Sequence, residues 1–213
     1  MKLYRHYKNK NYKYIGVAKH SETLEDVVIY ECLYENPTAC LWVRPKELFF
    51  GTIDTDETPT PRFSQIPLKI ISTSDVAAAR IDEILPIMEH VFGSQDPEEV
   101  HSRLVSHSKP FLVWAEVEGK IVAFKLGYEE DRGSFYSWLG AVLPEYRGLG
   151  IASALMTHQH EWCRAQGYTT VRTKTQNRFR EMLLLNLKFG FEIIGTHSCA
   201  NDGPKIILEK RIL

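Results

Sequence analysis

The sequence predicts a mixed αβ (α+β) domain preceded by a small, mostly β module. Three observations favour this fold class. A polar, proline-containing segment near residues 55–67 divides the chain, short aromatic and β-branched runs precede it, and strand-like and helix-like segments alternate after it. The length of 213 residues allows one large domain or two modest ones. We therefore expect a first module at residues 1–63, a linker at 64–67 and a second domain at 68–213.

The first module is expected to be barrel-like and built from short strands. Its strand-like runs cover residues 12–18, 27–34 and 41–43, and short polar turns separate them. A module of this size buries only a limited core, so we expect it to pack against its neighbouring domain.

The second domain is expected to begin with a strand at 68–71 and a helix at 76–92, whose residues Ile81, Ile84 and Met88 form one apolar stripe. Asp96 and Pro97 supply an N-cap and a first-turn proline for a second helix. Three antiparallel strands follow at 111–117, 120–128 and 135–142. The remaining elements are a helix from 150 to 167, a strand at 169–173, a helix at 177–189 and strands at 191–195 and 205–212, with Gly167 and Gly190 ending the helices.

The composition argues against several classes of partner. The formal net charge of −1 gives no field that favours nucleic acid, and no apolar run approaches the roughly 20 residues that cross a bilayer. The four cysteines form no CxxC pair and lie at no zinc-ligand spacing, so no metal is expected. The N-terminus lacks an apolar signal segment, which favours a cytoplasmic location.

The main chemical signal lies where an apolar strand enters a glycine-containing turn that opens the long helix. The segment from Val142 to Ala152 reads VLPEYRGLGIA. Such a turn leaves several backbone N–H groups directed at one spot, with the positive end of the helix dipole behind them. This arrangement suits a phosphate or pyrophosphate. Glycine is needed because a Cβ would block the close approach of a ligand to the backbone.

The spacing of the glycines separates this turn from other phosphate-binding loops. The glycines are Gly148 and Gly150, and Ser153 stands where a third would be required, so the chain has no G-x-G-x-x-G there. No G-K-[ST] follows either. Antiparallel strands precede the turn, which does not fit a βαβ dinucleotide-binding unit.

The run Arg147-Gly148-Leu149-Gly150-Ile151-Ala152 resembles the R/Q-x-x-G-x-G/A signature of the GNAT acyltransferases, with Val142 five residues before the arginine. The resemblance covers about residues 68–213 and extends to the order of elements and to Gly190-Phe191 after the last helix. It implies the GNAT fold, a splayed mixed sheet with flanking helices. It further implies that acetyl-CoA is the co-substrate and that a primary amine of a small molecule or protein is the acceptor. The amine would attack directly in a ternary complex, without a metal.

The resemblance also implies which residues bind the co-substrate. The pyrophosphate would contact the backbone of residues 147–152, and the pantetheine arm would lie in the splay. A backbone N–H near Val142 would polarise the thioester carbonyl. The expected binding set is Gly140, Ala141, Val142, Arg147, Gly148, Leu149, Gly150, Ile151, Ala152 and Asn186.

Two departures from the family pattern concern catalysis. Many members place a proton-donating tyrosine on the last helix, where this chain has Asn186, whose amide can hydrogen-bond sulfur but cannot act as an acid. Some members place a glutamate base on the strand before the turn, and residues 135–142 contain no carboxylate. Glu116, Glu129, Tyr136 or an ordered water remain alternatives for the base. Asn186, Glu116 and Tyr136 are the catalytic candidates.

Residues 4–63 resemble a family of small bacterial domains of unknown function. The resemblance rests on YRHYK at 4–8, HSET at 20–23, Val28-x-Tyr30, WVRP at 42–45 and Arg62-Phe63, and it transfers no activity. An alternative to catalysis therefore stays open. The second domain would then hold acyl-CoA as a regulatory ligand with weak turnover, while the first module binds a polar ligand or RNA. GNAT relatives are often dimers, so a homodimer is one expected assembly.

Overall fold

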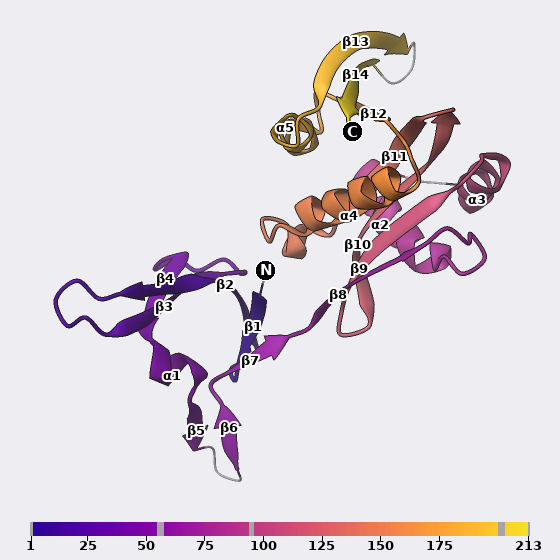
Figure 1. The fold of residues 1–213 in the computed structure, drawn as a ribbon. Coiled ribbons are helices and arrows are strands. Elements are labelled where there is room, and N and C mark those ends of the chain that lie inside the picture. The colour runs from indigo at the N-terminus through magenta and orange to yellow at the C-terminus, as the bar shows by residue number, and fades with distance from the viewer. Residues whose placement is uncertain (1, 55–57, 94–95, 200–202, 213) are drawn as a thin grey trace. The chain divides into compact units, whose positions relative to one another are not determined.

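The computed structural model describes residues 2–54, 58–93, 96–199 and 203–212. The chain divides into two compact units, each of which is described by itself (Figure 1). The first contains the chain up to Lys69 together with residues 116–120 and 144–150, and the second contains the remainder. Residues 55–57 of the predicted boundary segment lie outside the described residues.

The first unit is built on a five-stranded antiparallel sheet of order β4-β3-β2-β1-β7. Its strands are β1 (Lys2–His6), β2 (Lys10–Lys19), β3 (Asp26–Cys32), β4 (Leu41–Pro45) and β7 (Phe63–Ile66). A short helix α1 (Lys46–Phe50) and a small ribbon of β5 (Thr52–Asp54) and β6 (Pro59–Pro61) connect β4 to β7. The predicted linker at 64–67 thus overlaps a strand that pairs with β1.

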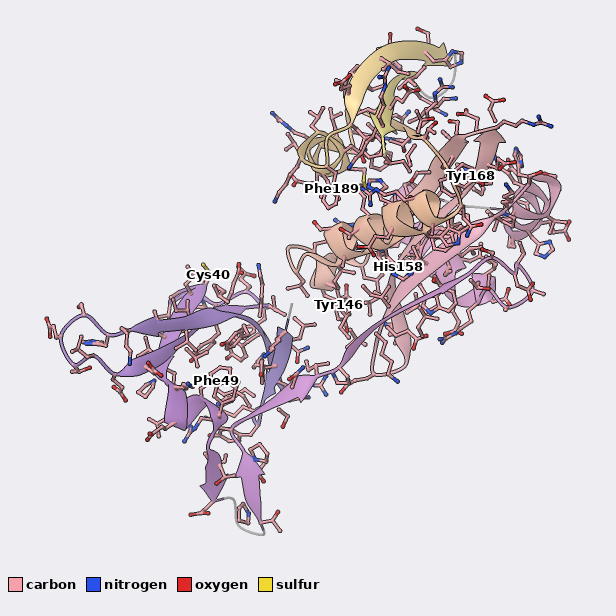
Figure 2. All side chains as sticks on the ribbon, in the orientation of Figure 1. Cys40, Phe49, Tyr146, His158, Tyr168 and Phe189 are labelled. Atoms are coloured by element: carbon pink, nitrogen blue, oxygen red, sulfur yellow. The ribbon has the colours of Figure 1, made fainter. Side chains whose placement is uncertain are left out.

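One face of this sheet carries an aromatic core. Phe49 of α1 is completely buried and reaches onto the sheet (Figure 2), where its ring stacks on Phe63 with centroids 4.1 Å apart. Tyr4, Val28 and Tyr30 complete the buried cluster. Aromatic side chains bury large areas with few rotatable bonds, which lets a small module form a stable core.

The second unit is built on a seven-stranded mixed sheet of order β13-β14-β12-β11-β10-β9-β8 (Figure 1). The strands are β8 (Leu68–Thr73), β9 (Phe111–Val117), β10 (Lys120–Asp131), β11 (Ser134–Val142), β12 (Thr170–Gln176), β13 (Glu192–Cys199) and β14 (Gly203–Arg211). The helices are α2 (Ile81–Phe92), α3 (Pro97–Ser106), α4 (Ile151–Ala165) and α5 (Arg180–Lys188). This is the mixed α/β architecture with a separate mostly-β module that the sequence predicts.

Helices cover both faces of the central strands. On one face, α2 and α3 pack Met88 and Leu104 against Leu112 of β9 in one buried cluster. On the other face, Trp162 of α4 stacks on Phe111, with ring centroids 4.1 Å apart. Every residue of β9 is buried for this reason, since a strand covered on both faces cannot alternate between core and solvent.

The first helix of the second unit begins at Ile81, not at residue 76 as the apolar pattern predicts. Side chains hold the preceding segment in turns: Asp75 N–H donates to Thr73 Oγ1 at 3.0 Å, and Ala77 N–H donates to Asp75 Oδ1 at 2.9 Å. Such local bonds compete with helix formation. The predicted N-cap of the next helix is confirmed, because Asp96 Oδ1 accepts from Glu98 N–H at 2.9 Å.

Within the described ranges, no helix is both long and apolar enough to span a bilayer.

Candidate active site

The signature segment forms a tight turn between a strand and a helix. β11 ends at Val142, a short 3-10 turn follows at Pro144–Tyr146, and α4 begins at Ile151. Between them, Gly148 and Gly150 adopt φ angles of +71° and +77°. These left-handed conformations favour glycine, because a Cβ would be strained there. The two glycines that sequence analysis singled out are therefore required by the backbone itself.

The turn alternates between buried anchors and exposed backbone. Leu149 and Ile151 are 2% and 1% exposed, whereas Arg147, Gly148 and Gly150 are exposed. The exposed part lies directly before the first turn of a 15-residue helix, where the helix dipole is positive and N–H groups lack partners within the helix. These residues fit an anion such as a pyrophosphate.

The sheet opens between β11 and β12. The two strands pair in parallel only where Ser134–Tyr136 meet Thr170–Arg172, although both continue well beyond that point. One side-chain bond spans the position where they diverge: Thr173 Oγ1 donates to the Ser137 carbonyl oxygen at 2.8 Å, and it is buried. The predicted splay is thus present, and it leaves one edge of β11 after Ser137 without a paired strand in the part of the chain that the structure describes.

A small, largely apolar cavity, open to solvent, lies beside the diverging end of β11. Ala152 at the start of α4 belongs to its wall, as do Gly140, Ala141 and Val142 of the predicted binding set. At Gly140 a Cβ would come within 3.3 Å of the Phe124 carbonyl oxygen, a close contact between β10 and β11 that favours glycine. The full lining is Phe124, Lys125, Gly140, Ala141, Val142, Ala152, Leu155, Met156, Met182 and Leu185.

Lys125 is the one charged residue in this lining. It lies on β10 opposite Gly140 and is only 8% exposed. Burial lowers the pKa of its ammonium to about 8, because the charged form loses its hydration. Sequence analysis did not select Lys125. The available signal was a single lysine inside the apolar run from Ile121 to Leu126, in a strand expected to be buried.

Two further titratable groups of α4 surround Lys125. Burial raises the pKa of the Cys163 thiol to about 12, and burial lowers the pKa of His160 to about 3. The imidazole is 2% exposed, its Nε2 has no hydrogen-bond partner among the described residues, and its centroid lies 6.2 Å from the ring of Phe189. Near neutral pH both groups are therefore uncharged, and Lys125 is the group of the three that titrates close to neutrality.

Asn186 lies on the cavity side of α5. It is 2% exposed and follows Met182, which lines the cavity, by four residues. Residues four apart share a helix face. Asn186 thus shares a helix face with a residue of the cavity wall, and its role stays a prediction.

The candidates for the base lie in different surroundings. Glu116 is buried near the end of β9, beside the turn that leads to Lys120. Tyr136 is buried opposite Tyr128, and its burial raises its pKa to about 12. Lys120 and Tyr128 are eight residue steps apart on β10, about 27 Å at ~3.4 Å per residue. Glu116 and Tyr136 are therefore alternatives, because one amine cannot contact both.

Glu129 is already engaged in other contacts. Its Oε2 accepts from Lys109 Nζ at 2.8 Å and from the Tyr168 hydroxyl at 2.9 Å. The hydrogen bond from Lys109 is the main reason that the pKa of this carboxyl is lowered. A carboxylate held in this way is a weaker base than a free one.

No group of three or more His, Cys, Asp or Glu side chains that could hold a metal ion occurs among the described residues.

Comparison with known families matches both parts of the chain. The model of the acetyltransferase (GNAT) family matches residues 79–191, and the model of a protein family of unknown function (DUF1653) matches residues 2–65. An acetyltransferase of Pectobacterium atrosepticum is 30% identical over 116 residues, which cover 54% of this chain and 79% of that protein.

Two solved structures illustrate the shared fold. Ard1 from Thermoplasma volcanium superposes with a TM-score of 0.59 at 20% identity, covering 68% of this chain and 98% of that one. An aminoglycoside 6′-N-acetyltransferase complexed with coenzyme A superposes with a TM-score of 0.57 at 15% identity, covering 67% and 97%.

Proposed function

Because this chain belongs to the GNAT family of acetyltransferases, we propose that it transfers the acetyl group of acetyl-CoA to a primary amine. The amine belongs to a small molecule or a protein and attacks the thioester directly in a ternary complex. An amide forms, the C–S bond breaks, and coenzyme A leaves as the thiol. The observation that carries this proposal is the glycine turn that opens α4 beside the splay between β11 and β12.

The backbone of residues 147–152, here called the cradle, and the apolar cavity suit acetyl-CoA. The left-handed Gly148 and Gly150 keep the backbone before α4 accessible to a pyrophosphate. The cavity is lined mainly by apolar side chains, including Met156 and Met182, which adapt to a flexible chain such as the pantetheine arm. A fold relative carries coenzyme A in its solved complex. When bound, acetyl-CoA supplies the activated acetyl group, and the chain orients it and excludes water.

Lys125 is the proposed acid for the departing thiol. Asn186 cannot donate a proton as an acid, whereas the Lys125 side chain lines the same cavity. The lowered pKa of about 8 leaves most of this ammonium protonated at neutral pH and makes its proton easier to release than that of an exposed lysine. Its proton would pass to the sulfur as the C–S bond breaks, with Asn186 as a hydrogen-bond donor nearby.

Glu116 is the proposed base among the side chains considered. The raised pKa of Tyr136 keeps its hydroxyl protonated near neutrality, so it can donate a hydrogen bond but is a poor acceptor of a proton. Glu129 accepts two hydrogen bonds already. Glu116 is a buried carboxylate, and an ordered water relayed to it is an equivalent path.

Direct attack is favoured over a covalent intermediate on cysteine. Cys163, on α4 of the second unit, is a free cysteine and is fully buried. Its raised pKa of about 12 leaves it as a thiol, and the thiol is a poor nucleophile compared with the thiolate.

The test is a binding and turnover experiment on the full chain. Thermal unfolding is measured with acetyl-CoA, with coenzyme A and with NAD, and thiol release from acetyl-CoA is then followed across a panel of small amines and peptides. A ligand at about 100 times its dissociation constant stabilises the fold by about 2.7 kcal/mol. We expect stabilisation by both coenzyme A compounds, none by NAD, and thiol release with at least one amine.

Other outcomes have separate meanings. Stabilisation by acetyl-CoA without thiol release across the whole panel would favour an acyl-CoA-binding regulatory role over catalysis. The absence of any stabilisation by either coenzyme A compound would contradict the assignment of the cradle and the cavity.

A further inference from the structure

The aromatic face of the first unit also carries cationic side chains. Cross-strand neighbours point to the same face of a sheet. Val28 is opposite Arg44 in the β3–β4 pair, and Val28 is fully buried in the aromatic core. Arg44 therefore lies on the core face of the sheet, where a charged group is expected to have a partner.

Ring and hydrogen-bond contacts join Arg44 to a second basic position. Arg44 Nε donates to the Tyr30 hydroxyl at 3.4 Å, and the Tyr30 ring lies 5.4 Å from that of Phe63. The Phe63 ring lies 4.7 Å from the imidazole of His6, which is opposite it in the β1–β7 pair. Arg62 directly precedes Phe63. Arg44, Arg62 and His6 are each half-buried, so the cluster is open to a ligand from solvent.

No described carboxylate neutralises this cluster. Neither Arg44 nor Arg62 forms an ion pair with any acidic side chain in the described ranges. Arg62 Nε is buried and has no hydrogen-bond partner there. Burial, followed by the charges of Arg44, Arg62 and Lys8, lowers the pKa of His6. The charges of Arg44, Arg62 and Lys8 thus oppose protonation of the His6 ring.

The imidazole adds a third donor. His6 Nδ1 accepts from the backbone N–H of Lys8 at 3.3 Å. In the neutral ring the proton is therefore assigned to Nε2, which becomes a hydrogen-bond donor. Two guanidinium groups and one imidazole N–H then form a set of donors for which the described residues supply few acceptors.

We propose that Arg44, Arg62 and His6 form a binding site for an oxyanion, the carboxylate or phosphate group of a small ligand. Guanidinium groups bind both kinds of oxyanion through paired, charge-assisted hydrogen bonds. An oxyanion would supply the acceptor that Arg62 Nε lacks and would reduce the repulsion among the cations. The surrounding tyrosine rings would pack on the rest of the ligand. This site uses other residues than the acetyl-CoA cradle and does not depend on acyl transfer.

The test is a site-resolved titration of the full chain. Nitrogen-15 correlation spectra report the Nε–H resonances of Arg44 and Arg62 and the ring nitrogens of His6, while inorganic phosphate, acetate or chloride is added at constant ionic strength. We expect saturable shifts of the Arg62 Nε–H and His6 signals with phosphate or acetate and none with chloride. The stronger of the two active anions identifies the ligand class. Equal responses to all three anions, or no response, would overturn the proposal.

Variants separate a built site from general charge. Hydrogen bonds to charged groups contribute about 1.5–3 kcal/mol, so Arg44→Gln and Arg62→Gln should each weaken anion binding about tenfold or more. Lys19→Gln removes one positive charge from an exposed position of the same unit and should leave the affinity within about twofold. Arg62→Lys keeps the charge but loses the paired N–H donors of the guanidinium group, and we expect it to bind the anion almost as weakly as Arg62→Gln. If Lys19→Gln weakens binding as much as the arginine variants, the site is not specific. The wild-type titration decides the question if an arginine variant does not fold.

Discussion

At the scale of single residues, the buried Lys125 lowers the stability of the fold and is also the proposed acid. Its pKa falls from 10.5 to about 8 in the folded chain, which corresponds to about 3 kcal/mol of unfavourable burial of the charged form. We predict that Lys125→Met, which keeps a chain of similar length without charge, stabilises the fold at pH 7 by about 2–3 kcal/mol. The same variant should lower kcat by about 100-fold or more, with a smaller change in KM.

Denaturant unfolding and steady-state kinetics measure the two effects of Lys125→Met. Because an acid must be protonated, kcat of the wild-type chain should decline as pH rises through about 8, and the variant should lack this decline. Lys120→Met, at the exposed start of the same strand, is the control and should change neither quantity. A Lys125→Met variant with normal kcat and an unchanged pH profile would show that Lys125 is not the acid.

The glycines of the turn could be predicted from the sequence, whereas the burial of Lys125 could not. Gly148 and Gly150 lie in one contiguous run whose spacing alone predicts left-handed backbone before a helix. The burial of Lys125 depends on α4, which follows it in the chain and covers the same face of the sheet. A local pattern contains no information about that packing, and the lysine stands out only once the helix is in place.

At the scale of elements, the start of α4 requires glycine for two reasons. Any side chain at Gly150 is strained by its φ of +77°, and one that projects there would also occupy the space proposed for the pyrophosphate. We predict that Gly150→Glu lowers the affinity for acetyl-CoA by at least about 100-fold, because it adds both a side chain and a negative charge opposed to the phosphates. Isothermal titration calorimetry measures this change.

Gly167→Glu provides a matched control for Gly150→Glu. Gly167 is exposed just after the other end of α4 with a φ of +82°, so glutamate there introduces the same backbone strain away from the cradle. We expect similar losses of thermal stability in the two variants and normal acetyl-CoA affinity in Gly167→Glu. Equal affinities for acetyl-CoA in both variants would contradict the assignment of the cradle to residues 147–152.

One buried hydrogen bond spans the point where β11 and β12 diverge. Thr173→Val keeps the shape of the side chain but leaves the Ser137 carbonyl without the donor that lies 2.8 Å away. We predict a loss of about 1–2 kcal/mol in the free energy of unfolding and weaker binding of acetyl-CoA. Thr170→Val, where the corresponding donor–acceptor distance to Gly133 is 3.5 Å, should lose less. Chemical denaturation compares the two variants, and equal losses would contradict a special role for Thr173.

At the scale of the whole molecule, the elements of the second unit could largely be predicted from the sequence. The pairing of β1 with β7 in the first unit could not. Asp96 caps the start of α3 and Gly167 follows the end of α4, and both signals can be recognised from a few neighbouring residues. The pairing of Leu3 with Ile66 joins the two ends of the first unit, and β1 carries Lys2 and Arg5 among its few residues. Such a strand is defined by its distant partner, so a search for apolar runs overlooks it.

The pH dependence of folding stability depends on two buried bases, Lys125 and His160. Each has a lower pKa in the folded chain than in the unfolded one, from 10.5 to about 8 for Lys125 and from 6.5 to about 3 for His160. The unfolded chain therefore binds more protons between the two values of each pair, and stability rises with pH there. The contribution of His160 is complete above pH 6.5 and is lost as pH falls toward 3. The contribution of Lys125 is complete above pH 10.5 and is lost as pH falls toward 8.

We predict that His160→Gln reduces the stability loss between pH 6.5 and 3 by about 4–5 kcal/mol, because glutamine does not titrate. Nearby Lys210, Lys125 and Arg164 also lower the pKa of His160. Lys125→Met should therefore slightly reduce the loss of stability at acid pH, here called the acid limb. The same variant should remove the increase in stability between pH 8 and 10.5, here called the basic limb. His101→Gln, at an exposed position of α3, is the control and should leave both limbs unchanged. Urea unfolding across the pH range measures the limbs. An acid limb that is equally steep in His160→Gln would place the acid sensitivity in the carboxylates instead.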